Sequence, residues 1–470
     1  MNMPVKLIGG LVASVLAGGA AADVISGVSA VQDAATRLVT VTYTLSETAV
    51  VTPEITVDGT VDASVPVTAV SGEINRKLET GTHSFTWRPR ADWPVGRGFA
   101  DAKIAVRAWP LDAPPDYLVA DLRTTGAMRY YATAAAIPSG VQGAGTQGGL
   151  VLRRIRATGR RYRMGSPGEE AGRVALREIP HYVTLTNDFY IGLWPVTCEQ
   201  HFYVMNEPGT APNSDCISRP KLGLGFADMR GSGSDYDWPD RGHDVSGGSF
   251  FGRLRTRTGI KTLDLPTEAE WEFACRAGTD TPLYDAGPAT ALAWYADSDF
   301  SANGGDGDKN KVQHCGLLRP NAWGLFDMLG DCYEFCLDWY SEGSDFATSG
   351  MEVTAPVGPA SNADGKKVTR GGCYKNEESV IRCAFRGYDN VTGYSLTGFR
   401  VAGRADVSDG QPTFAAEESR GASLAGFDLS SGGEVAATLT PFDSLVRYTA
   451  VSVGMNFKST EPTGALLIFR

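Results

Sequence analysis

The sequence predicts an α+β protein in three parts: a small all-β domain, a larger irregular domain and a strand-rich C-terminal segment. The first part follows from Leu38–Leu45, where β-branched residues recur with the period near two that is typical of strands. The second follows from Thr267–Ala274, a short helical run in a region dense in Gly, Asn, Asp and aromatic residues. The third follows from strand-like runs such as Ala465–Phe469.

Length and composition agree with a globular protein of two or three domains. The chain has 470 residues, of which 42% are hydrophobic and 21% are charged. Its formal net charge of -11 argues against a nucleic-acid partner, because a phosphate-binding face needs concentrated Lys and Arg. The one basic cluster, Arg153–Arg163, interleaves with apolar residues, and we interpret it as the polar face of a strand.

The first residues predict export. One positive charge in Met1–Lys6 precedes the apolar run Leu7–Gly19, and Ala20–Ala22 resembles a small-residue cleavage site. The run is short for a membrane span, and no later stretch is long and apolar enough, so no membrane span is predicted. We therefore expect a protein that is secreted, periplasmic or held at the cell surface. An uncleaved N-terminal anchor is the alternative.

Composition shifts along the chain give the predicted domain boundaries. Further strand-like runs at Ser84–Trp87 and Lys103–Trp109 are separated by turn residues and favour a β-sandwich, of immunoglobulin-like type. Tyr117–Leu122 is one more strand candidate. The boundaries are a signal peptide at 1–22, the β-sandwich domain at 23–112, a linker with one strand at 113–149, the central domain at 150–405 and a C-terminal β segment at 406–470.

The clearest helix of the central domain begins after Pro266. Thr267 is a suitable N-cap, and glutamates in the first turn suit the positive end of the helix dipole. Trp271 and Phe273 then offer large apolar surfaces, and we expect both in the core.

The cysteines are eight in number and all lie in the middle of the chain: Cys198, Cys216, Cys275, Cys315, Cys332, Cys336, Cys373 and Cys383. An even number in an oxidising compartment predicts disulfides, although eight cysteines allow about 105 pairings. The sequence has no Cys-x-x-Cys pair and its five His are scattered, so a zinc site is not expected.

Several short segments follow one another along the central domain: Met164–Ser166, Phe189–Gly192 with Pro195–Thr197, Leu265–Gly278, Asn321–Asp331, Arg370–Gly372 and Gly398–Val401. In this order they resemble the formylglycine-generating-enzyme (sulfatase-modifying factor) family. The resemblance implies a variant of the C-type-lectin fold, an α+β domain with little regular structure for its size.

The resemblance fails at the catalytic residues of that family. Its enzymes use two cysteines shortly after the Arg-Gly-Gly segment to bind copper(I) and oxidise a sulfatase cysteine, and soft thiolates suit copper(I). Here the first of these positions is Asn376, Glu377–Ile381 contains no cysteine, and Cys373 stands where the family has a serine. The sequence therefore predicts a non-catalytic protein without copper. The alternative is a copper-dependent formylglycine-generating oxidase with rearranged thiols, acting on sulfatase cysteines.

The resemblance also implies a structural calcium ion and one disulfide. Calcium prefers six to eight hard oxygen ligands. The implied ligands are the side chains of Asp327 and Glu334 and the carbonyls of Gly330 and Cys332. The alternative is that the two acids are solvated turn residues. The implied disulfide joins Cys275 and Cys383.

The segment after Arg-Gly-Gly is the candidate ligand-binding groove of an exported binding or adhesion protein. Tyr and Asn side chains give rigid and adaptable contacts, and Tyr rings stack on sugars, so a protein or carbohydrate ligand is expected. The candidate residues are Cys373, Tyr374, Asn376, Glu377, Arg386, Tyr388, Asp389, Asn390 and Tyr394. Alternatively, these residues only solubilise a loop. A loop diversified at the gene level is disfavoured, because a long segment follows Gly398–Val401.

Overall fold

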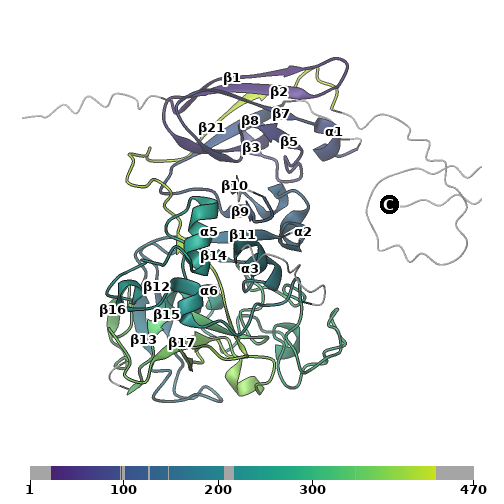
Figure 1. Ribbon diagram of the computed structural model, residues 1–470. Helices are drawn as coiled ribbons and strands as arrows, with labels where there is room; N and C mark the ends of the chain where they lie inside the picture. The colour runs from purple at the N-terminus through teal and green to yellow at the C-terminus, as the bar shows by residue number, and fades with distance from the viewer. Residues whose placement is uncertain are drawn as a thin grey trace, which may run out of the picture.

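The computed structural model describes residues 23–95, 97, 101–124, 128–146, 148–205, 216–343 and 346–429. A β domain stands above a larger mixed domain in Figure 1. The predicted signal peptide, and Ala465–Phe469 with the rest of the chain beyond residue 429, lie outside the described residues. A search of the described part of the chain finds no helix long and apolar enough to cross a membrane.

Two antiparallel sheets form the N-terminal domain and share one apolar core. The first sheet has the order β1 (Ile25–Gln32), β2 (Val39–Leu45), β7 (Gly81–Trp87) and β5 (Val70–Gly72). The second has the order β21 (Glu418–Ser423), β8 (Ala102–Trp109), β3 (Ala49–Val57) and β4 (Thr60–Val61), with β6 (Arg76–Leu78) also paired to β3. Alternate residues of β2 are buried, so the period near two predicted this strand correctly.

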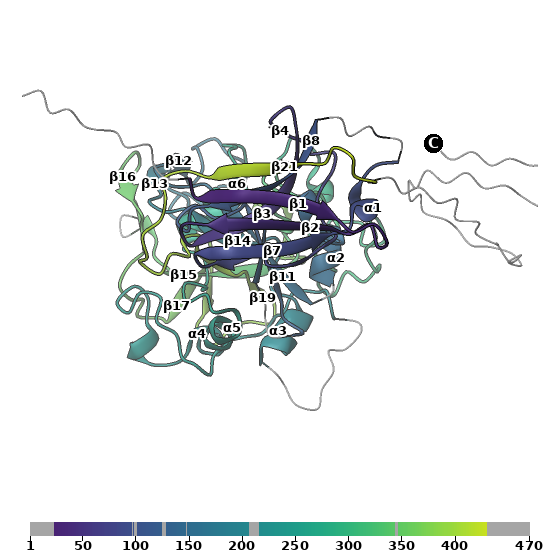
Figure 2. The same ribbon diagram turned by 90° about the horizontal axis from the view of Figure 1, so that it is seen from above.

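The C-terminal segment returns to the N-terminal domain. Strand β21 pairs antiparallel with β8, from Glu418 opposite Ala108 to Ser423 opposite Lys103. The Glu418 carboxylate also accepts a hydrogen bond of 2.8 Å from the backbone N–H of Val24. In Figure 2, β21 lies along β1 at the margin of the domain. Because β8 would otherwise be an unpaired edge strand, β21 completes this sheet.

The main sheet of the central domain begins earlier in the chain than the sequence predicted. Its order is β10 (Met128–Tyr131), β9 (Tyr117–Asp121), β11 (Gly149–Ile155), β14 (Phe189–Gly192) and β20 (Ala402–Arg404), all antiparallel. Residues 113–149, expected to be a linker with one strand, thus contribute two strands to this sheet. Leu118 and Leu152 are buried in the same apolar cluster, which explains why the segment docks here.

Two smaller sheets and a set of short helices complete the central domain. The sheets are β12 (Arg161–Met164), β13 (His181–Thr184) and β16 (Glu352–Thr354), and β18 (Gly387–Asn390), β17 (Lys366–Arg370), β15 (Tyr333–Trp339) and β19 (Thr397–Phe399). The α-helices of the central domain are α2 (Gly140–Thr146), α3 (Cys198–Met205), α4 (Phe226–Arg230), α5 (Phe250–Thr258) and α6 (Glu268–Arg276). The short helix α1 (Pro89–Asp92) belongs to the N-terminal domain. This sheet-rich architecture with short helices agrees with the predicted α+β class.

Helix α6 begins with the predicted cap. The Thr267 hydroxyl accepts a hydrogen bond of 3.2 Å from the Glu270 N–H, and the Glu270 carboxylate accepts one of 2.9 Å from the Thr267 N–H. This reciprocal pair satisfies two N–H groups that the first turn of a helix leaves free. Trp271 is fully buried and Phe273 nearly so, as predicted. The cap therefore fixes the start of a helix that the core surrounds.

We predict that Thr267→Ala lowers the free energy of unfolding by about 1 kcal/mol, because it removes the capping hydroxyl. Thr267→Ser keeps a hydroxyl and is expected to retain most of the stability. Urea unfolding followed by tryptophan fluorescence measures both changes. Equal stability of the alanine variant and the wild type would contradict the role of the cap.

Candidate functional site

The Arg-Gly-Gly segment turns the chain inward at the end of β17. Gly371 and Gly372 have φ angles of 90° and 74°, in the region that favours glycine. A Cβ on Gly371 would lie 3.1 Å from the Met328 carbonyl oxygen, and one on Gly372 would lie 3.2 Å from Ile381. The close approach leaves no room for side chains at these two positions, and it places the following residue, Cys373, in the interior.

Cys373 is a single buried thiol. Its backbone N–H donates to the Asn376 side-chain oxygen at 2.6 Å, and the Asn376 N–H donates to the Cys373 carbonyl at 2.9 Å. Burial raises the pKa of the Cys373 thiol. Asn376 thus closes a small turn at the position where the family resemblance implies a thiol. Within the described part of the chain, no second sulfur lies within hydrogen-bonding distance of Cys373.

Two other pairs of thiols are neighbours. The Sγ atoms of Cys275 and Cys383 lie 3.6 Å apart, which brings the predicted partners together. All eight cysteines are free thiols, however, so the predicted Cys275–Cys383 disulfide is not formed in this structure. The Cys198 thiol donates to the Pro220 carbonyl at 3.8 Å, and burial first, then the neighbouring Cys216 thiol, raises the pKa of Cys198 to about 12.

Arg386 is held in the core by ion pairs, although it also borders a second hollow of about 420 Å³. It is 1% exposed, and its Nη2 donates to Glu268 of α6 at 2.8 Å. Arg370 donates to Glu268 at 2.7 Å and to Glu272 at 2.7 Å, and Arg276 donates to Glu272 at 2.8 Å. We call these five residues the buried ion cluster. Burial raises the pKa of Glu268, but Arg386 and Arg370 outweigh it and bring the pKa to about 2.

The remaining predicted groove residues differ in their exposure. Tyr374 is 5% exposed, and its hydroxyl donates to the Asn310 carbonyl at 2.7 Å. Asp389 accepts a hydrogen bond of 2.7 Å from the Thr397 hydroxyl. The exposed members are Glu377, Tyr388, Asn390 and Tyr394. The structure thus corrects the prediction that Cys373, Tyr374 and Arg386 are open to a ligand. The inward turn buries Cys373 and Tyr374, and the carboxylate of Glu268 holds Arg386 in the core.

The implied calcium ligands fit the structure only in part. Both Glu334 oxygens are engaged, by Arg400 at 2.7 and 3.0 Å and by the Trp271 indole N–H at 2.8 Å. Asp327 accepts one hydrogen bond of 2.7 Å from Gly316, and burial raises its pKa to about 6. The neighbouring Asp331 is buried and its Oδ2 has no hydrogen-bond partner. Among the described residues, no three His, Cys, Asp or Glu side chains converge as a metal site.

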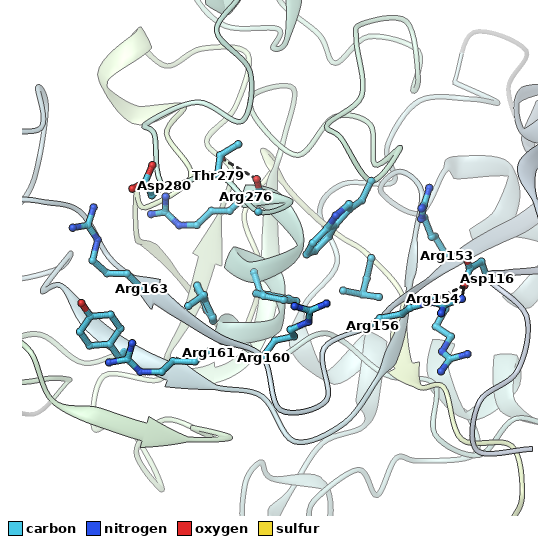
Figure 3. Close-up of a pocket in the computed structure, with 16 residues that line it drawn as sticks. Asp116, Arg153, Arg154, Arg156, Arg160, Arg161, Arg163, Arg276, Thr279 and Asp280 are labelled. Atoms are coloured by element: carbon cyan, nitrogen blue, oxygen red, sulfur yellow. Dashed lines mark hydrogen bonds and ion pairs between the residues drawn. The ribbon is translucent and has the colours of Figure 1, made fainter. Parts of the chain in front are cut away.

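A hollow of about 760 Å³ is lined by none of the predicted groove residues, and the sequence did not predict it. Figure 3 shows arginines around it, with Arg276, Thr279 and Asp280 on the opposite wall. We call it the basic hollow. Its lining residues are Asp116, Arg153, Arg154, Ile155, Arg156, Arg160, Arg161, Tyr162, Arg163, Tyr182, Phe273, Arg276, Gly278, Thr279, Asp280 and Trp323.

The sequence held a signal for this hollow. Arg153–Arg163 is the predicted basic cluster, but the structure divides it between β11, a turn and β12. Gly159, with a φ of 71°, lies in the turn. The arginines therefore line a concave surface between two strands rather than one strand face. The Thr158–Gly159 pair was the turn signal that separated the two strands.

A family model described as the sulfatase-modifying factor enzyme 1-like domain matches residues 153–405. The chain belongs to the sulfatase-modifying-factor family. The family predicted from the ordered segments is thus confirmed. Its motifs lie on elements that pack together in this structure: α6, the loop before β15, the end of β17, and β19.

Curated relatives carry two kinds of name. The serine/threonine-protein kinase pkn1 of Chlamydia pneumoniae is 31% identical over 227 residues, which are 48% of this chain and 34% of that protein. The formylglycine-generating enzyme of Bos taurus is 32% identical over 149 residues, 29% of this chain and 38% of that protein. The formylglycine-generating enzyme of Thermomonospora curvata is 31% identical over 149 residues, which are 29% of this chain and 48% of that protein. The chain spans about a third of the length of the kinase relative that it matches.

Two solved structures align with part of this chain at low similarity. They are Treponema denticola variable protein 1, with a TM-score of 0.40, and PvdO from Pseudomonas aeruginosa, with a TM-score of 0.41. Both are 20% identical to this chain, and each alignment covers 55% of this chain and 95% of the other.

We predict that Glu268→Gln lowers the free energy of unfolding by about 3–5 kcal/mol at neutral pH, because it leaves buried Arg386 without its carboxylate and removes one of the two carboxylates that pair with buried Arg370. The depressed pKa of Glu268 stabilises the folded wild type above pH 4.5, and this stabilisation is lost as the pH falls from 4.5 towards 2. The variant is expected to lack that part of the pH dependence. Urea unfolding at several pH values measures both effects.

The matched control is Glu352→Gln. Glu352 pairs with Arg161 at 2.6 Å on the surface, where a salt bridge contributes about 0–1 kcal/mol. A loss of stability in Glu268→Gln no larger than in this control would contradict the assigned role of the cluster.

Proposed function

We propose that this protein is an exported, non-catalytic binding or adhesion protein built on a sulfatase-modifying-factor domain. The observation that supports this most directly is the place of Asn376. Its side-chain oxygen accepts the Cys373 N–H at the position where the family's enzymes carry a catalytic thiol. An amide oxygen in that place supplies no soft ligand for copper(I).

The raised pKa of the buried Cys373 thiol also supports a non-catalytic protein. A metal-binding or nucleophilic cysteine acts as the thiolate, and burial raises the pKa of this thiol. A copper(I) centre would further require a second thiolate beside it. Asn376 and its turn fill that neighbourhood, so the segment acts as part of the scaffold and the binding surface lies elsewhere.

Export and the finer fold assignments are part of the proposal. The apolar run Leu7–Gly19 is our reason for placing the protein in the periplasm, at the cell surface or outside the cell. The neighbouring thiols of Cys275 and Cys383, and of Cys198 and Cys216, are positioned to form two disulfides in an oxidising compartment. We assign the central domain to the C-type-lectin variant of its family and the N-terminal domain to the immunoglobulin-like sandwiches.

The test is a conversion assay on a sulfatase-type Cys-x-Pro-x-Arg peptide. The protein is incubated with the peptide, copper(I) and oxygen, beside an authentic formylglycine-generating enzyme, and the peptide mass is measured. We expect no conversion of the peptide cysteine while the authentic enzyme converts it. Conversion that disappears in Cys373→Ser would establish the oxidase alternative and overturn the proposal.

We further propose that a structural calcium ion, if the domain keeps the family's ion, is held by Asp327 and Asp331 rather than by Glu334. The support is the unpartnered Oδ2 of buried Asp331, since a buried carboxylate oxygen without a donor favours a cation. Glu334 is already paired with the Arg400 guanidinium and accepts the Trp271 indole N–H, so its charge is balanced without an ion.

We predict that calcium raises the melting temperature of the wild type and that Asp331→Asn removes this increase, because the variant loses an anionic oxygen ligand. Differential scanning fluorimetry with and without calcium measures the change. Asp285→Asn, at a partly exposed acid paired with Arg319 at 3.6 Å, is the control and should keep the calcium response. An Asp331→Asn variant with the full response would contradict this ligand set.

A further inference from the structure

The basic hollow is formed by two parts of the central domain that face each other. Strands β11 and β12, with the turn between them, bring Arg153, Arg154, Arg156, Arg160, Arg161 and Arg163 to it. The end of α6 and the residues after it bring Arg276, Thr279 and Asp280 to the opposite wall (Figure 3). A volume of about 760 Å³ suits a small organic ligand, whose pockets usually measure about 300–1,000 Å³.

Four of the seven arginines already have a carboxylate partner. Arg154 pairs with Asp188 at 2.7 Å, Arg156 with Asp116 at 2.9 Å, Arg161 with Glu352 at 2.6 Å and Arg276 with Glu272 at 2.8 Å. These pairs neutralise much of the positive charge around the hollow. They therefore account for the positions of those side chains without any ligand.

The other three arginines have no carboxylate partner in the part of the chain that the structure describes. Arg153 donates to the Tyr117 hydroxyl at 2.8 Å and lies over that ring, but neither contact neutralises its charge. No ion pair or side-chain hydrogen bond of Arg160 or Arg163 is formed with any described residue. On the lining, only Asp280 is an acid without a partner. The hollow thus keeps an excess of positive charge in a protein whose formal net charge is -11.

Aromatic rings form part of the same lining. Phe273 lies between Tyr162 and Trp323, with ring centroids 5.1 Å from each. Phe273 is buried, while Tyr162 and Trp323 are half-buried and keep part of their surface towards the hollow. Guanidinium groups and aromatic rings around one hollow suit a ligand that has both anionic groups and an apolar ring face.

We propose that the basic hollow binds a compact organic oxyanion, about the size of a disaccharide, that carries two or more sulfate, phosphate or carboxylate groups. Arg153, Arg160 and Arg163 supply charge-assisted hydrogen bonds to the oxyanions, since guanidinium forks match their geometry. Tyr162 and Trp323 contact the ring. A long polyanion is disfavoured, because beyond the hollow it would run along an acidic protein. This inference goes beyond the proposed function and holds whether or not the domain is catalytic.

Isothermal titration calorimetry on the full chain tests the proposal with four probes: a sulfated disaccharide, the same disaccharide without sulfate, a nucleoside diphosphate and inorganic sulfate. We expect one of the two organic anions to bind best, which identifies the source of the oxyanion as saccharide or nucleotide. Inorganic sulfate should bind weakly because it has no ring, and added salt should weaken binding. Equal binding of the sulfated and the uncharged disaccharide would overturn the proposal.

The decisive variant is Arg160→Ala combined with Arg163→Ala. Neither side chain has a partner among the described residues, so the fold should remain. The affinity for the organic anion should fall at least tenfold, roughly the effect of losing one charged hydrogen bond. Arg241→Ala, at an exposed arginine that does not line the hollow, is the control and should bind as the wild type does. No anion binding by the wild type, or unchanged binding by the double variant, would overturn the proposal and leave the peptide assay of the proposed function unaffected.

Discussion

The buried ion cluster on α6 is the constraint on which the central domain depends. Glu268 and Glu272 lie on a helix that is buried on nearly every side, and a buried carboxylate is unfavourable unless it is paired and hydrogen-bonded. Arg370, at the end of β17, bonds to both carboxylates. The start of the Arg-Gly-Gly segment is thereby tied to the helix, and the inward turn at Gly371 and Gly372 follows from this attachment. Cys373 follows this turn and is buried.

The same residue type has two roles in this protein, and burial separates them. Arg370, Arg386 and Arg400 are almost fully buried and each bonds to a glutamate, so they hold elements of the core together. Arg160 and Arg163 reach the surface of a hollow and have no carboxylate partner in the described chain. Replacing a buried partner affects stability. An arginine of the second kind contributes little to folding, and its charge is available to a ligand.

Local patterns in the sequence predicted local structure well. The period near two in Leu38–Leu45 gave β2, and Thr267 with Glu270 gave the cap of α6, because each signal lies within a few residues of its effect. Spatial neighbours distant in sequence were harder to predict. The sequence placed Arg386 in a groove because its partner Glu268 is 118 residues away and could not be recognised. The basic hollow was missed because one short turn divides its arginines between β11 and β12. The Cys275 and Cys383 neighbourhood was found only through family resemblance, as their spacing alone does not select a partner.

The C-terminal strands β20 and β21 anchor the end of the described chain in both domains. Strand β20, after the Gly398–Val401 segment, pairs with β14 of the main sheet, and β21 completes a sheet of the N-terminal domain. The chain between Arg370 and Gly398 is therefore held at both ends by paired strands, with β17 before it and β19 and β20 after it. Within this stretch β18 pairs with β17, whereas the side chain of Asn376 accepts its hydrogen bond from nearby Cys373, so another residue at position 376 would leave these strand pairs in place. Selection on a surface elsewhere, such as the basic hollow, can then act on a fold that stays intact.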